Sequence, residues 1–163
     1  MPTAIYPGTF DPVTYGHIDI AVRASKIFKK VIAVVASNPG KNPLFTVEER
    51  VDMVSEALAH VPHIEVISYS GLIVDCVREY NATAIIRGLR AISDFDYEFQ
   101  MAFTNRNLLD SAETVFLMPS SEYIYLNSTL VKQIAQHGAG SQVCTFVPEF
   151  VKEQLIKKLK KNR

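Results

Sequence analysis

The sequence contains little cysteine, no net charge and no long hydrophobic run. Its two cysteines, Cys76 and Cys144, lie far apart in apolar surroundings and lack the spacing of metal ligands. We expect both to be reduced, buried thiols of a cytosolic protein, in preference to members of a disulfide framework.

The charge balance and the apolar runs bound the class of protein. Lys plus Arg and Asp plus Glu each total 17, so the formal net charge is zero and no global field favours nucleic acid or a membrane as a partner. The longest purely apolar run, residues 31–36, is too short to cross a bilayer, and the N-terminus lacks the pattern of a signal peptide. The basic end, residues 157–163, is interpreted as a solvated helix terminus, with a nucleic-acid tail as the alternative. We therefore expect a soluble, cytoplasmic protein.

Short runs rich in Val and Ile alternate with helical patterns, and the 163 residues, 48% hydrophobic, predict a single domain over 1–163. The runs predict strands buried on both faces at residues 3–7, 31–37, 64–68, 83–88 and 114–119. Helices are predicted at residues 17–28, 46–60, 72–80, 94–109 and 128–136, and from 148 onward; Thr46 and Glu49 have the spacing of a capping box. The alternation predicts an α/β fold, a Rossmann-like doubly wound parallel five-stranded sheet with helices on both faces.

Chemically unusual loops follow four of the predicted strands. They read PGTFDPVTYGH, SNPGKNPLF, RGLRAISDFDYE and PSSEYIYLNST, at residues 7–17, 37–45, 87–98 and 119–129. In an open parallel sheet, ligands bind beyond the carboxyl ends of the strands. The four loops are therefore expected to open on one shared edge.

The first loop ends in TYGH, where a helix is expected to begin. Its glycines let backbone approach a ligand, and the Thr9 hydroxyl can face an anion. A helix N-terminus favours phosphate, and His17 adds a further hydrogen-bond donor there. A plain capping role for His17 is the alternative, but the motif in this context favours phosphate binding. Asp11, beside Pro12, is assigned a turn role.

Three cations lie in the next two loops. Lys41 lies between two prolines, which restrict the flexibility of its loop. From this loop its ammonium can reach an anion held at the end of the first strand. The alternative is that Lys41 is a solvated surface charge. Arg87 ends an apolar strand, a costly place for a charge without an anion, and Arg90 follows three residues later. Phosphate accepts the forked hydrogen bonds of both. The structural alternative is a salt bridge to a neighbouring carboxylate: Asp94, Asp96 or Glu98.

The last loop ends in LNST, residues 126–129, directly before LVKQIAQ. Ser128 or Thr129 is predicted to be the N-cap or the first turn of another helix. As a cap alone it would be unremarkable, but it provides a second donor-rich helix start at the same edge of the sheet.

Together these motifs resemble the bacterial phosphopantetheine adenylyltransferases, within the nucleotidyltransferase superfamily that carries an HxGH-like motif. The resemblance covers nearly the whole chain; TxGH alone indicates the superfamily, whereas RGLRAxxDFxYE with PGTFDPxTxGH is specific to the family. It implies transfer of AMP from ATP to 4′-phosphopantetheine, giving dephospho-coenzyme A and pyrophosphate. It also implies Mg²⁺ as cofactor, a homohexamer and feedback binding of coenzyme A.

The resemblance also implies the site residues, carried over position by position. The phosphopantetheine positions are Thr9, Lys41, Ile73 and Arg87, with Thr9 shared with ATP. The ATP positions are Phe10, His17, Gly88, Leu89, Arg90, Glu98, Tyr123, Ile124, Tyr125, Leu126, Asn127, Ser128 and Thr129. The predicted catalytic residues are Thr9, His17, Lys41 and Arg90, and His17 is the family's transition-state stabiliser. No protein ligand to Mg²⁺ is expected, since the phosphates hold the ion.

Two departures from the family pattern are visible. Asn127 stands where the family has a serine, and Gln133 stands where some members have a glutamate. An amide still donates hydrogen bonds, so we expect Asn127 to contact phosphate with a different detailed geometry, and glutamine supplies no acidic group at position 133.

Two other functions fit the same residues. One is a nucleotidyltransferase that acts on another phosphorylated small molecule. The other is a non-catalytic adenine-nucleotide sensor, since a fold alone never fixes function. A sensor gives no reason for Lys41 and His17 to join a phosphate site at a helix end.

Overall fold

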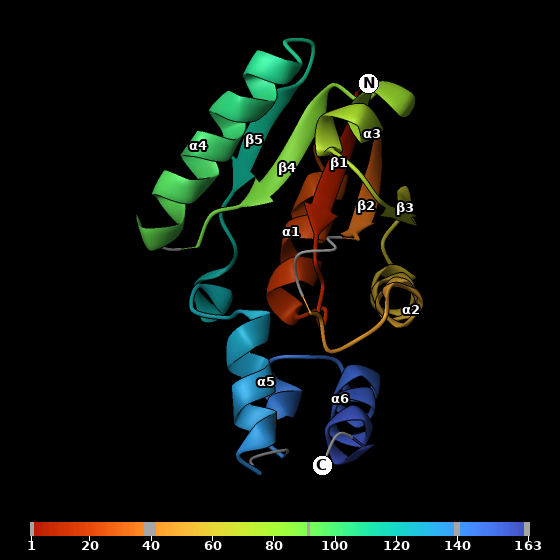
Figure 1. Ribbon diagram of the computed structural model, residues 1–163, viewed down its shortest axis with the longest axis vertical. Helices are drawn as coiled ribbons and strands as arrows, with labels where there is room; N and C mark the ends of the chain where they lie inside the picture. The colour runs from red at the N-terminus through yellow and green to blue at the C-terminus, as the bar shows by residue number, and fades with distance from the viewer. Residues whose placement is uncertain (1, 38–41, 91, 139–140, 162–163) are drawn as a thin grey trace.

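Five parallel strands form one sheet in the order β3-β2-β1-β4-β5 (Figure 1). The computed structural model describes residues 2–37, 42–90, 92–138 and 141–161. The chain winds outward from the centre through β2 to β3, then crosses back to β4 beside β1, which makes the β1/β4 boundary the switch point. The predicted doubly wound, five-stranded parallel sheet is thereby confirmed. The strands are β1 (Thr3–Gly8), β2 (Lys30–Ala36), β3 (Ile64–Tyr69), β4 (Ala84–Gly88) and β5 (Glu113–Leu117).

Helices connect the strands and follow the last one. The helix predicted at residues 128–136 has those bounds, and the others differ from prediction by up to three residues at an end. The predicted capping box of Thr46 and Glu49 is present. The helices are α1 (Tyr15–Ser25), α2 (Val47–Leu58), α3 (Ile73–Glu79), α4 (Ile92–Leu108), α5 (Ser128–Gln136) and α6 (Glu149–Lys161), with short 3₁₀ turns η1 (Ser121–Tyr123) and η2 (Val143–Thr145).

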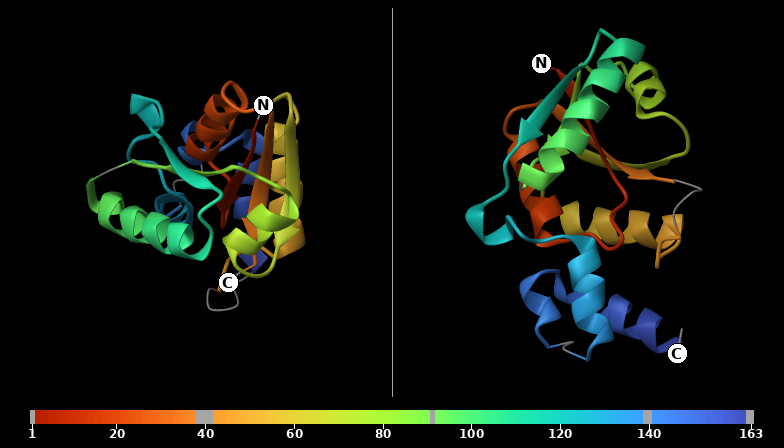
Figure 2. Two further views of the ribbon diagram at one scale, coloured as in Figure 1. Left: turned by 90° about the horizontal axis from the view of Figure 1, so that it is seen from above. Right: turned by 60° about the vertical axis from the view of Figure 1, so that its left-hand side comes forward.

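The two faces of the sheet bury alternate residues of the central strands. Tyr6 faces a core shared with α1 and α2, whereas its neighbour Ile5 faces a second core that contains Cys76 and Val77 of α3. Seen from above, α1 lies on the opposite side of the sheet from α3 and α4 (Figure 2). The prediction of helices on both faces is confirmed.

Two predictions about burial are wrong. β3 and β5 are only partly buried, since each is an edge strand with one neighbour, and Glu65 and Glu113 on them are exposed. Cys144 is exposed as well, because the short turn η2 directs Val143 inward and leaves the Cys144 thiol at the surface, donating to the Ser141 carbonyl. Cys76 is buried as predicted, and burial raises its pKa to about 11.

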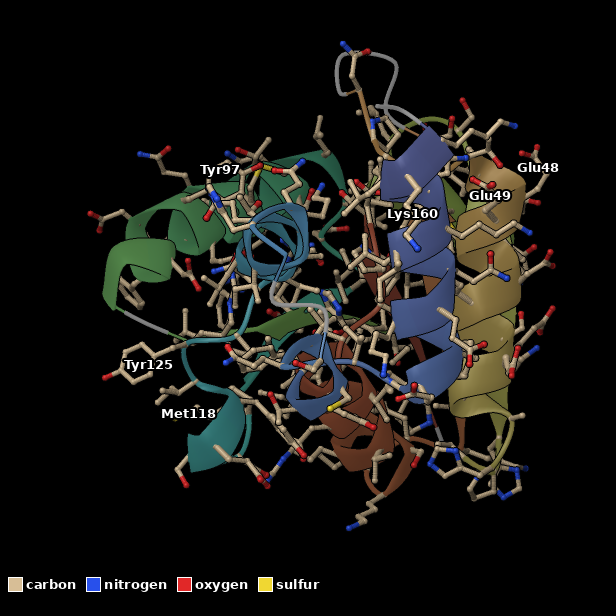
Figure 3. All side chains as sticks on the ribbon, turned by 90° about the horizontal axis from the view of Figure 1, so that it is seen from below. Glu48, Glu49, Tyr97, Met118, Tyr125 and Lys160 are labelled. Atoms are coloured by element: carbon tan, nitrogen blue, oxygen red, sulfur yellow. The ribbon has the colours of Figure 1, made fainter. Side chains whose placement is uncertain are left out.

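Helices α5 and α6 lie beyond the carboxyl edge of the sheet (Figure 1). Val151 and Leu155 anchor α6 in the core, and the Lys158 ammonium reaches both carboxylate oxygens of Glu49 at 2.7 and 2.8 Å. Figure 3 looks onto this end and shows Glu49 on the side of α2 that faces α6. Lys158 therefore lies in the last turn of a helix, as interpreted, but its ammonium is paired with Glu49 and is not simply solvated. Within the described ranges, no helix has both the length and the apolar character needed to cross a membrane.

Candidate active site

All four predicted loops start where a strand of the sheet ends. Because the strands are parallel, Thr9 after β1, Arg90 after β4 and the segment after β5 emerge at the same carboxyl edge (Figure 1). Lys41, predicted for the loop after β2, lies outside the described residues.

His17 is held by the N-terminal cap of α1. The backbone N–H of Thr14 donates to Nδ1 of His17 at 3.0 Å, and the Thr14 hydroxyl lies 3.0 Å from the same atom. In return, the His17 backbone N–H donates to the Thr14 hydroxyl at 3.4 Å. Since Nδ1 accepts an N–H, the neutral ring carries its proton on Nε2. The capping alternative is thus correct for Nδ1, and it leaves Nε2–H as a donor.

The surroundings of His17 keep its ring neutral. Burial, and after it the positive charges of Arg90 and Arg87, lower the pKa of His17 to about 4. The ring meets Phe10 edge to face, with 5.1 Å between centroids. At physiological pH the edge of the sheet therefore presents a neutral hydrogen-bond donor in a fixed orientation.

Arg87, near the end of β4, and Arg90, after it, each contact a carboxylate of α4. Arg87 donates two hydrogen bonds to the carboxylate of Glu98, from Nε at 2.7 Å and from Nη2 at 2.6 Å. Its Nη1 donates to the Pro7 carbonyl at 3.3 Å. Arg90 donates from Nε to Asp94 at 3.1 Å. The salt-bridge alternative is therefore correct for Glu98 and Asp94. A guanidinium has five N–H groups, so two or three bonds do not exhaust its donors for a phosphate.

The segment that leads into α5 contacts two of the other loops. Nη1 of Arg90 donates to the Leu126 carbonyl at 2.9 Å, and the Ser128 hydroxyl donates to the Pro12 carbonyl at 2.8 Å. Asn127 is the N-cap, and its side-chain oxygen accepts the Leu130 N–H at 2.8 Å. The first-turn position predicted for Ser128 is confirmed, and the cap is the residue before it, since Asn caps helices as well as Ser does.

The remaining predicted positions are more dispersed. The Tyr123 ring stacks on Tyr15 with 6.2 Å between centroids, whereas Tyr125 is 83% exposed and points outward (Figure 3). The Leu89 N–H, directly after Gly88, donates to the Leu117 carbonyl and joins β4 to β5. Ile73 is half-buried at the start of α3, against the second core. Ile124 and Thr129 complete the segment around Asn127, half-buried and exposed respectively.

Asp11 does more than the predicted turn role. It is 4% exposed, and its two carboxylate oxygens accept the N–H groups of Leu44 and Phe45, each at 2.9 Å. One oxygen also pairs with the Lys132 ammonium of α5 at 2.7 Å. Asp11 therefore joins the loop after β1 to the segment before α2 and to α5.

Arg50 is a further residue near the site that was not predicted from the sequence; it is buried in α2 and reaches the Thr9 carbonyl. Its local sequence, TVEER, reads as the solvated charges of a helix start, and no local signal indicates a buried arginine.

An open cavity of about 480 Å³ lies between the segment before α2 and helix α5. The Lys132 ammonium that pairs with Asp11 contributes to its wall, and so does Gln133, one of the two departures noted above. The lining residues are Asn42, Pro43, Leu44, Thr129, Lys132, Gln133 and Gln136.

The chain is similar to known proteins over most of its length. A family model described as cytidylyltransferase-like matches residues 5–134. The phosphopantetheine adenylyltransferase of Caldanaerobacter subterraneus subsp. tengcongensis is 51% identical over 162 residues, covering 99% of this chain and 100% of that protein.

Two solved structures have a similar fold. The Plasmodium falciparum nicotinic acid mononucleotide adenylyltransferase complexed with NaAD has a TM-score of 0.68 at 13% identity, covering 98% of this chain and 95% of that one. Thermotoga maritima TmcAL bound with alpha-thio ATP has a TM-score of 0.67 at 12% identity, covering 100% of this chain and 57% of that one. At such low identity these two likenesses concern the fold alone.

Proposed function

Because this chain belongs to the phosphopantetheine adenylyltransferase family, within the cytidylyltransferase-like group, we propose that it transfers the adenylyl group of ATP to 4′-phosphopantetheine. The products are dephospho-coenzyme A and pyrophosphate. The single observation that carries the proposal is the full-length 51% identity to a phosphopantetheine adenylyltransferase. The fixed, neutral His17 at a helix N-terminus supports it.

The reaction proceeds by in-line attack. An oxygen of the phosphopantetheine phosphate forms a bond to the α-phosphorus of ATP, and the bond from that phosphorus to the bridging oxygen breaks. Pyrophosphate leaves with the electron pair, and no covalent enzyme intermediate forms. The attacking oxygen is already anionic at neutral pH, so no general base is required and catalysis depends on positioning and charge stabilisation.

Each donor at the edge of the sheet has a part in this hypothesis. Thr9 and Lys41 hold the attacking phosphate, and His17 with Lys41 stabilises the charge that grows on the α-phosphate. Arg90 and Ser128 hold the β- and γ-phosphates. A neutral imidazole that donates from Nε2 strengthens its hydrogen bond as the negative charge develops.

The remaining positions form the walls of the two substrate sites. Ile73 and Arg87 contact phosphopantetheine, and Arg87 is oriented for this by Glu98. ATP binds along Phe10, residues 88–90, Glu98 and residues 123–129. Three of these residues already contact one another or His17: Phe10, Arg90 and Leu126.

We propose Mg²⁺ as the cofactor, held through phosphate oxygens of ATP. The two buried carboxylates near the site fit this arrangement. Asp11 is paired with Lys132 and Glu98 with Arg87, so both carboxylates already have a cationic partner. When bound, the ion neutralises charge on the β- and γ-phosphates and on the departing pyrophosphate.

A cytoplasmic homohexamer with feedback binding of coenzyme A completes the proposal. Helix α4 supports the assembly, since it exposes large apolar side chains along its length, and exposed apolar surface of this kind marks interaction sites. Figure 3 shows Tyr97 on its outer side. The side chains, each at least 38% exposed, are Phe95, Tyr97, Phe99, Met101, Phe103 and Leu108.

The test is a pyrophosphate-release assay with ATP, Mg²⁺ and a panel of phosphorylated small-molecule acceptors. We expect release with 4′-phosphopantetheine and not with the other acceptors. Release with a different acceptor would instead support the alternative nucleotidyltransferase. Binding of ATP without release for any acceptor would support the nucleotide sensor.

A further inference from the structure

Arg50 of α2 is a buried cation that the mechanism above does not use. Its side chain is among the largest fully buried ones, and the residue is 2% exposed. Its Nη1 donates to the carbonyls of Thr9 and Ala36 at 2.7 and 3.0 Å. Its Nε donates to the carbonyls of Phe45 and Thr46 at 3.2 and 3.3 Å.

These four carbonyls belong to three separate segments of the site. Thr9 follows β1, Ala36 ends β2, and Phe45 and Thr46 lead into α2. The guanidinium is planar and its N–H groups point in fixed directions, so bonds to three segments fix their relative positions. A buried cation is costly without such bonds. The buried guanidinium of Arg50 thus lies where three segments of the site meet and holds them together through hydrogen bonds.

The bond to Thr9 has a direct consequence for the backbone of the site. In a trans peptide the C=O and the following N–H point in opposite directions, so the bond from Arg50 to the Thr9 carbonyl directs the Phe10 N–H away from Arg50. Phe10 has a φ of 51°, in the left-handed region that a phenylalanine rarely adopts. Its ring contacts that of His17. The Arg50 bond therefore sets the plane of the peptide that joins two predicted substrate-binding residues.

We propose that Arg50 is a positioning residue for adenylyl transfer, acting through the Thr9–Phe10 peptide. The inference rests on the proposed function and adds a residue to it. Arg50 is assigned no contact with either substrate, since its bonds within the described residues are to backbone carbonyls. Lysine keeps the charge but donates from a single atom, and one ammonium cannot span the carbonyls that two guanidinium nitrogens reach.

The test compares steady-state kinetics and melting temperature for the wild type and Arg50→Lys. Small misplacements of reacting groups cost up to about a hundredfold in rate, so we expect kcat to fall by about tenfold to a hundredfold, with a smaller change in the KM for ATP. Two control variants accompany it. Val54→Ala removes buried volume from the same helix, and Arg78→Lys alters an exposed arginine of α3 that also donates to a carbonyl.

The controls separate positioning from stability. If Val54→Ala lowers the melting temperature as much as Arg50→Lys does but keeps kcat within about threefold of the wild type, the loss in Arg50→Lys is one of positioning. Equal kcat in Arg50→Lys and the wild type, an equal loss in Val54→Ala, or failure of Arg50→Lys to fold would each overturn the proposal. A wild-type protein that releases no pyrophosphate with phosphopantetheine would contradict the proposed function instead.

Discussion

The Nδ1 atom of His17 accepts the backbone N–H of Thr14 at 3.0 Å, so the imidazole belongs to the cap of the helix that carries it. One bond therefore settles three properties of the ring: its orientation, its tautomer and the position of its free donor. The helix N-terminus and Nε2–H then favour an anion at the same place.

The lowered pKa of His17 predicts how stability depends on pH. The pKa is about 4 in the folded protein, below the ordinary value of 6.5 for histidine. Well above pH 6.5 both states are neutral and the group contributes nothing. As the pH falls from 6.5 towards 4, His17 binds a proton in the unfolded chain but stays neutral in the folded protein. The free energy of unfolding therefore falls, by about 3 kcal/mol at most.

This pH effect is measured by urea denaturation of the wild type and His17→Gln. The variant lacks the titrating imidazole. As the pH falls from about 7.5 to about 4.5, its free energy of unfolding should therefore rise relative to that of the wild type. A difference that stays constant over this range would show that the folded-state pKa of His17 is not lowered.

Removing the carboxylate of Asp11 should destabilise the protein. In Asp11→Ala the N–H groups of Leu44 and Phe45 and the ammonium of Lys132 lose their shared acceptor. We expect the free energy of unfolding to fall by about 3 kcal/mol. Asp75→Ala is the matched control, because the Asp75–Arg78 pair is about half exposed and should contribute about 1 kcal/mol or less. Similar losses in both variants would refute this role for Asp11.

A charge on the outer side of α4 should disrupt assembly. Phe99 is 46% exposed and its ring contacts those of Phe95 and Phe103. Phe99→Glu is expected to sediment as a smaller species than the wild type, since burying an unpaired carboxylate at an interface is costly. Leu72→Glu, at a site 59% exposed on another part of the surface, should sediment like the wild type. A monomeric wild type would contradict the proposed hexamer.

A single in-line displacement should invert the configuration at the α-phosphorus of ATP. The measurement uses ATP made chiral at that phosphorus with sulfur and assigns the configuration of the product. Retention would indicate two displacements and an adenylylated enzyme, contrary to the proposed direct attack.

Features that depend on neighbouring residues were predictable from the sequence. The capping box of Thr46 and Glu49 needs a spacing of three residues, and it forms as predicted. The Val- and Ile-rich runs predicted the strands because a strand at the centre of a doubly wound sheet is buried on both faces. Edge strands such as β3 depart from the rule because they have a neighbour on one side only.

Features that depend on distant residues were not predictable in detail. Arg50 and Thr9 are 41 residues apart, and Asp11 and Lys132 are 121 residues apart. Their pairing follows from how the loops meet at the edge of the sheet, and a single sequence carries no signal for it. The family resemblance predicts the positions of the site residues, and these stay predictions. The pairing of Arg87 and Arg90 with carboxylates was foreseen only as an alternative, among three acidic residues that are near them in the sequence.

The most direct test of the account is the rate at which dephospho-coenzyme A forms from ATP and 4′-phosphopantetheine, followed by mass spectrometry in the wild type and in His17→Ala. Deleting one preorganised donor to a transition state costs about a hundredfold or more in kcat, so we expect a loss of that size with a melting temperature close to that of the wild type. A wild type that forms no dephospho-coenzyme A, or a His17→Ala variant that forms it as fast, would contradict the account.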